Sequence, residues 1–174
     1  MTYFFHMGLG MLVIILQTTV FHRLGLSTGF YDLLIVQIIY LGLYRPLRES
    51  LIIIGMIGFA MDSLTGGPYG LYLTTYFWIF AGVRWSMAYF HLSNTLIFPF
   101  VVAFGVIVEN LIHLVGTVSF EAAPVSIART DFRTVILQLL WSVLTGPLVL
   151  ILLNKLYRHS EKWFLRVLAT GREN

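Results

Sequence analysis

Six apolar segments, joined by short polar connections, take up most of this chain of 174 residues and limit what it can fold into. Hydrophobic residues make up 58% of the sequence and charged residues only 11%, whereas soluble domains carry roughly 25% charged residues. A helix crosses the hydrocarbon core of a bilayer with about 20 mainly apolar residues. We therefore predict an all-α membrane protein with six transmembrane helices. The predicted spans are residues 4–21, 30–44, 47–64, 69–90, 95–117 and 134–154.

The second span is short, and the connections differ in length. Residues 30–44 are too few for a full crossing, so this span extends into its flanks, is protected by neighbouring helices, or lies where the bilayer thins. Arg45 and Pro46 separate the second and third spans, and the longest predicted loop covers residues 118–133.

Basic residues near the span ends set the expected orientation, because cytoplasmic loops carry an excess of Lys and Arg. With six spans, both termini lie on the same side of the membrane. That side collects Arg45, Arg48, Arg84, Lys155, Arg158, Lys162, Arg166 and Arg172, and the other side has Arg23, Arg129 and Arg133. We therefore expect cytoplasmic N and C termini, with the connection between the third and fourth spans on the outer face.

The last residues differ in character from the transmembrane domain of residues 1–154. In the tail, residues 155–174, basic side chains recur at helical spacing with Trp163 and other apolar residues roughly opposite. This pattern favours an amphipathic helix that lies in the headgroup plane. A simple basic flank of the last span is the alternative. The side chains expected at the interface are Lys155, Arg158, Lys162, Trp163 and Arg166.

Several functional classes find no support in the sequence. The chain has no cysteine, which excludes disulfides and thiolate metal sites. It has no phosphate-binding loop, no paired catalytic acids and no nucleophile–base arrangement, and we expect neither enzymatic activity nor a cofactor. The basic residues flank apolar runs and form no patch for nucleic acid.

Polar residues within the apolar segments recur at helical spacing. Such residues are costly in a membrane and usually face other helices. The three stripes are Gly55, Gly58 and Asp62; Gly105, Glu109, His113 and Gly116; and Gln138, Ser142 and Thr145. Because Asp62 and His113 lie at similar depth, we predict an intramembrane polar cluster of Asp62, Glu109 and His113.

Two features of this cluster admit more than one interpretation. Glu109 and His113 are four residues apart, so their side chains can meet. Structural pairing is favoured over contact with a proton or ligand, and a metal site would need a further ligand. Arg84, in the fourth span, is expected to reach the cytoplasmic headgroups, with pairing to a buried carboxylate as the alternative.

The connection after Asp62 is rich in residues that favour a tight turn. Its members are Gly66, Gly67, Pro68 and Gly70. The carboxylate of Asp62 could accept hydrogen bonds from amides of the turn, or from the start of the fourth helix, where the helix dipole favours negative charge. We favour this local role over ligand binding.

The stretch from Gly58 to Leu71, GFAMDSLTGGPYGL, resembles the Gly-x-x-x-Asp stretch of the MreD family of rod-shape membrane proteins. Weaker similarities are Leu16-Gln17, Tyr31-Asp-Leu-Leu, Glu109, Trp141, Pro147 and Lys155. The chain departs from the family in lacking a proline before Asp32. The resemblance covers nearly the whole chain, including its length and number of spans.

The resemblance implies a fold similar to the S-components of energy-coupling-factor transporters, in the bacterial inner membrane. It also implies a non-enzymatic protein that maintains cell shape by binding MreC and organising lateral peptidoglycan synthesis. The wider complex includes MreB, RodA and a class B penicillin-binding protein. Two alternatives stay open: an S-component-like subunit for vitamin transport and, less favoured, a lipid-handling enzyme. Membrane lipid surrounds the protein in each case.

Overall fold

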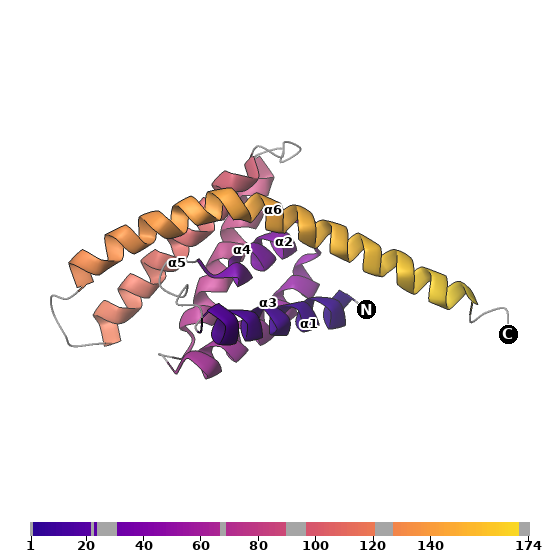
Figure 1. Cartoon of the computed structure of the whole chain (residues 1–174), viewed down its shortest axis with the longest axis horizontal. Coiled ribbons are helices and arrows are strands. Elements are labelled where there is room, and N and C mark those ends of the chain that lie inside the picture. Colours follow the sequence, from indigo (N-terminus) through magenta and orange to yellow (C-terminus); the bar gives the residue numbers. More distant parts are fainter. Residues whose placement is uncertain are drawn as a thin grey trace.

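The computed structural model describes residues 2–21, 23, 31–66, 69–89, 97–120 and 127–170, and all its regular elements are helices (Figure 1). Side chains are described at fewer positions, and those of residues 117–131 and 158–170 are among the exceptions. The six α-helices within these ranges are α1 (Thr2–Ile15), α2 (Leu33–Tyr44), α3 (Leu47–Thr65), α4 (Leu71–Tyr89), α5 (Phe98–Phe120) and α6 (Ile127–Thr170). A π-helix, η1 (Leu16–Phe21), continues α1. The predicted all-helical fold and number of α-helices are confirmed.

Helix α2 lies at the centre of the bundle. Every residue from Leu34 to Leu43 is buried, and α2 contacts each of the other five α-helices. Its 12 residues span only about 18 Å at 1.5 Å per residue. A helix that is apolar all round belongs in an interior, so neighbouring helices protect this short segment on all sides.

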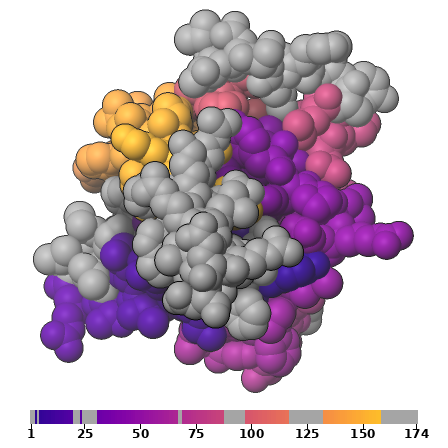
Figure 2. Space-filling model, turned by 90° about the vertical axis from the view of Figure 1, so that its right-hand side faces the viewer, coloured from indigo at the N-terminus to yellow at the C-terminus, as the bar shows by residue number. Residues whose placement is uncertain are grey.

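The surrounding helices have the opposite character, because they expose large apolar side chains. Phe59 of α3 is 67% exposed, Phe100 of α5 is 75% exposed and Leu148 of α6 is 66% exposed. Soluble proteins rarely expose apolar surface so widely. Seen from the right-hand side of Figure 1, α1 (indigo) and the described side chains of α6 (yellow) lie at the surface of this end (Figure 2). A buried apolar centre inside an apolar shell is the arrangement expected in lipid.

Two helices in the described ranges are long and apolar enough to cross a membrane by themselves: residues Phe98–Gly116 in α5 and Phe132–Tyr157 in α6. The segments Phe5–Thr19 and Leu33–Tyr44 are apolar but shorter. These helices support membrane association, and the crossing of all six helices stays a prediction.

The predicted loop over residues 118–133 is wrong at both ends. Helix α5 continues to Phe120, and α6 begins at Ile127. Hydropathy marks where a chain leaves an apolar medium, whereas a helix continues as long as its backbone hydrogen bonds and residue propensities allow. The charged and polar residues that suggested a loop are therefore compatible with the first turns of α6.

Helix α6 is 44 residues long and includes Pro147, which corresponds to a length of about 66 Å. It runs across the bundle and projects beyond it at the C-terminal end (Figure 1). The backbone has no break at residue 155, where we expected the tail to begin. Lys155 is exposed. The side chains of Arg158, Lys162, Trp163 and Arg166, and residues Gly67 and Pro68 of the predicted turn, lie outside the described residues.

Candidate functional site

Asp62 caps the beginning of α4 from the last turns of α3. Asp62 is only 3% exposed, and its carboxylate accepts hydrogen bonds from the backbone N–H groups of Tyr72 at 2.8 Å and Leu73 at 3.3 Å. The first N–H groups of a helix have no partner within the helix, and the helix dipole favours an anion there. These are the hydrogen bonds expected between Asp62 and the start of the fourth helix.

The glycines around Asp62 allow α3 and α4 to meet closely. A Cβ atom on Gly58 would lie 2.8 Å from the Cα atom of Leu73, so any other residue would force the two backbones apart. Gly66 ends α3 in the left-handed conformation, with a φ of 65°, and Gly70 precedes α4 with a φ of 93°. Positive φ values favour glycine. The sequence motif therefore builds the junction between α3 and α4.

Asp32 forms a second junction, which the sequence analysis missed as a site. It caps α2, because its Oδ1 atom accepts a hydrogen bond from the Leu34 N–H group at 2.8 Å. The same oxygen accepts from the Gln17 amide in η1 at 2.9 Å, and Oδ2 accepts from the Tyr76 hydroxyl in α4. An Asp directly before an apolar helix is a preferred N-cap, which was the available signal. One carboxylate thus joins η1, α2 and α4.

Tyr72 links two members of the predicted polar cluster, Asp62 and His113. The backbone of Tyr72 binds Asp62, and its ring packs edge-on against the His113 ring, with 4.9 Å between centroids and 80° between planes. Tyr72 therefore lies between Asp62 and His113, and the inclusion of Glu109 in the cluster stays a prediction.

Glu109 and His113 keep unpaired polar atoms within this cluster. Glu109 is 9% exposed. Among the described residues, its Oε2 atom and the His113 Nε2 atom have no hydrogen-bond partner, although both atoms are buried. The pairing expected from their spacing is therefore not made through these two atoms. Buried polar atoms normally have partners, which makes this part of α5 unusual.

Helix α6 makes polar contacts with α5 and with the residue before Asp32. The side-chain amide of Asn110 donates a hydrogen bond to the side-chain oxygen Oε1 of Gln138 at 3.0 Å. Tyr31 and Thr145 share a hydrogen bond between their hydroxyl groups at 2.9 Å. Ser142 is fully buried and bonds the Leu139 carbonyl of its own helix. The predicted stripe on the sixth span therefore faces the bundle, as its spacing indicated.

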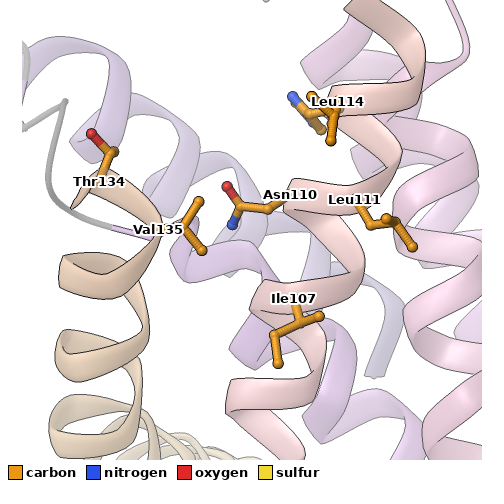
Figure 3. Close-up of a pocket in the computed structure, with 7 residues that line it drawn as sticks. Ile107, Asn110, Leu111, Leu114, Thr134 and Val135 are labelled. Atoms are coloured by element: carbon orange, nitrogen blue, oxygen red, sulfur yellow. The ribbon is translucent and has the colours of Figure 1, made fainter. Parts of the chain in front are cut away.

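A pocket of about 410 Å³ opens between α5 and α6. Figure 3 shows Asn110 of α5 pointing across it toward Val135 of α6, with Ile107 below. The described lining is mainly apolar, and His113 forms part of the wall. The lining residues are Ile107, Asn110, Leu111, His113, Leu114, Thr134 and Val135.

Arg84 binds the opposite end of α2, a contact that the sequence did not predict. Its Nη1 atom donates to the Gly42 carbonyl at 3.3 Å and to the Arg45 carbonyl at 3.2 Å. The last carbonyls of a helix lack partners within the helix, so a guanidinium beside them is favourable. Arg84 therefore caps α2 through Nη1, and its contact with the headgroups stays a prediction.

An aromatic cluster fixes α6 to the same end of the bundle. Tyr157 of α6 stacks on His6 of α1, with 5.5 Å between ring centroids and 5° between planes. The Arg45 guanidinium lies 3.6 Å from the centroid of the Tyr157 ring, which is a favourable cation–π geometry. These contacts hold α6 at the point where it leaves the bundle.

Within the described residues, His, Asp and Glu side chains form no group of three that could hold a metal ion. Family models, curated proteins and solved structures were compared with this chain, and none of them matches it.

Proposed function

We propose that this protein is a multi-pass component of the bacterial inner membrane that acts in the rod-shape complex without catalysing a reaction. In this proposal it resembles MreD, binds MreC, and helps to organise lateral peptidoglycan synthesis with MreB, RodA and a class B penicillin-binding protein. The proposal rests first on the Gly58–Leu71 stretch. Its distinctive residues each have a structural part in one junction: Gly58 allows close helix approach, Asp62 caps α4, and Gly66 and Gly70 shape the turn.

The hydrogen bonds made by polar side chains in the bundle support a scaffold function. Asp32, Asp62 and Arg84 each bind backbone groups at helix ends, and their role is to fix helices relative to one another. In lipid, where apolar surfaces gain little by pairing, such hydrogen bonds and close contacts at small residues determine how helices pack. A firmly packed bundle of this kind suits a protein that holds partners in place.

An S-component-like subunit for small-molecule uptake is the second candidate. It is favoured by one observation, the pocket of about 410 Å³ with Asn110, His113 and Thr134 in its mainly apolar wall. Pockets of roughly 300–1,000 Å³ with a few convergent polar groups are typical of ligand sites.

Depletion of the protein in its bacterial host tests the proposal against this alternative. We expect rod-shaped cells to become round and lateral peptidoglycan incorporation to fall, with vitamin uptake unchanged. Re-expression of the wild type should restore the shape, and Asp62→Leu should not. Normal cell shape after depletion, accompanied by loss of vitamin uptake, would favour the transporter subunit.

A further inference from the structure

Three arginines meet where the connection between α2 and α3 approaches α4. Arg45 lies in that connection, and the Arg84 Nη1 atom of α4 donates a hydrogen bond to the Arg45 carbonyl at 3.2 Å. Arg48 lies in the first turn of α3, three residues beyond Arg45. We call this cluster of Arg45, Arg48 and Arg84 the basic corner.

The packing of α3 on α4 places Arg48 and Arg84 at the same level of the bundle. A Cβ atom on Gly58 would lie 2.8 Å from the Cα atom of Leu73, so these two residues face each other across helices that run in opposite directions. Arg48 lies ten residues before Gly58, and Arg84 lies eleven residues after Leu73. Both arginines are therefore about 15–17 Å from that contact, toward the same end of the bundle, at ~1.5 Å per residue.

The described residues around the basic corner do not balance its positive charge. Arg84 uses only Nη1 for its two hydrogen bonds, and both go to backbone carbonyls. Within the described part of the chain, no ion pair joins any of the three arginines to a carboxylate. The acidic residue in the first turn of α3 is Glu49, which is half-buried. Three positive charges against one negative charge leave guanidinium groups available to an anion.

The residues beside the basic corner are typical of a membrane–water boundary. Tyr44, at the end of α2, is 46% exposed, and Trp85, next to Arg84, is 69% exposed. Exposed tyrosine and tryptophan side chains are enriched at the level of lipid headgroups. The distribution of basic residues predicts that this end of the bundle faces the cytoplasm, where the membrane leaflet carries anionic lipids.

We propose that the basic corner binds the headgroup of an anionic phospholipid. Arg48 and the remaining N–H groups of Arg84 would donate hydrogen bonds to phosphate oxygens, and Arg45 would add positive charge. Guanidinium groups suit phosphate because their planar fork donates two parallel hydrogen bonds. Phosphatidylcholine also has a phosphate, but its choline cation would be repelled by the same three arginines.

The test uses the full chain in nanodiscs that contain equal amounts of phosphatidylglycerol and phosphatidylcholine with identical acyl chains. Native mass spectrometry after release counts the lipids that stay bound to the protein. Each arginine near an anionic lipid favours binding about fivefold, so phosphatidylglycerol should be retained about tenfold or more over phosphatidylcholine.

Two matched substitutions locate the site. Arg48→Gln removes one guanidinium and should lower the retention ratio about fivefold. The melting temperature in nanodiscs of phosphatidylcholine alone should not change, because the Arg48 side chain is exposed. Arg133→Gln is the same change at an exposed arginine of α6 on the predicted outer side, and it should leave the ratio unchanged.

Two further measurements separate the basic corner from other anion sites. A tail variant with Lys162→Gln and Arg166→Gln should still show the loss of preference when Arg48→Gln is added. Millimolar inorganic phosphate in nanodiscs of phosphatidylcholine alone should stabilise the wild type less than phosphatidylglycerol does, because free phosphate has no acyl chains to hold it at this level. Equal stabilisation would identify a site for free phosphate and overturn the lipid assignment.

A wild-type ratio near one would overturn the proposal. An equal fall in the ratio for Arg48→Gln and Arg133→Gln would do the same, as would a preference that only the tail variant removes. The inference rests on the membrane embedding and orientation in the proposed function and not on MreC. Selective retention of phosphatidylglycerol without MreC binding would therefore contradict only the rod-shape assignment.

Discussion

Removal of the Asp62 carboxylate is the sharpest test of how α3 and α4 are joined. Asp62→Leu leaves the N–H groups of Tyr72 and Leu73 without their acceptor at the partly buried start of α4. An unsatisfied buried group costs about 1–3 kcal/mol, and loss of an N-cap side chain about 0.5–2 kcal/mol. These effects overlap, so we expect the free energy of unfolding to fall by about 2–4 kcal/mol.

Asp62→Asn separates the charge from the hydrogen bond. The amide keeps one oxygen for the Tyr72 N–H group but loses the second acceptor and the favourable interaction with the helix dipole, which is worth about 0.3–1 kcal/mol. We therefore expect a loss of about 1–2 kcal/mol, between the wild type and Asp62→Leu. The order wild type, Asn, Leu is the specific expectation.

Equilibrium unfolding of the purified chain in mixed micelles, followed by tryptophan fluorescence, measures these differences. Ser63→Ala is the matched control, because Ser63 is the exposed neighbour and its hydroxyl donates to the Phe59 carbonyl of its own helix. It should change stability by less than about 0.5 kcal/mol. If Asp62→Leu is as stable as this control, or if Asn is as damaging as Leu, Asp62 does not cap α4 as described.

Three other substitutions, with Gly55→Ala as the control for Gly58→Ala, test further helix contacts by the same unfolding measurement. Tyr76→Phe removes one donor to Asp32 and should cost about 1–3 kcal/mol; no loss would mean that this hydroxyl is not needed. Gly58→Ala should destabilise by about 1–3 kcal/mol, since the added Cβ meets backbone. Gly55→Ala meets nothing within 4 Å and should stabilise by up to about 1 kcal/mol, so equal effects of the two would contradict the close approach. Arg84→Met should cost about 1–2 kcal/mol by uncapping α2, and a neutral result would restore headgroup contact as its role.

The position of α2 shows what hydropathy can predict about a short apolar segment and what it cannot. The segment is too short to cross a bilayer alone, and protection by neighbouring helices was one of three explanations that the sequence allowed. Only the packed structure selects it, because α2 contacts all five other α-helices. Burial of Leu34 through Leu43 depends on partners from the whole chain.

The two acidic caps differ in how much a sequence can reveal. Asp62 and its acceptor role at the start of α4 could be predicted, because donor and acceptor are only 10 or 11 residues apart across a tight turn. Asp32 has a local signal as an N-cap, but Gln17 and Tyr76 lie 15 and 44 residues away. Their meeting depends on tertiary packing, which no local pattern encodes.

The ends of α5 and α6 show a different limit. The apolar run stops near residue 117, yet α5 continues to Phe120 and α6 starts at Ile127. Polarity locates the membrane boundary and says little about a helix that continues into water. The same reasoning explains why the basic tail was separated from a helix that continues without a break past Lys155.

The most direct test of the rod-shape proposal is affinity purification of the full chain from its native membranes under mild detergent. The proposal predicts that MreC is recovered in near-equal amount with the wild type and is strongly reduced with Asp62→Leu. The Ser63→Ala control should recover MreC as well as the wild type does. Recovery of a transporter ATPase with its membrane coupling subunit, in the absence of MreC, would contradict the proposal and support a function as a transporter subunit.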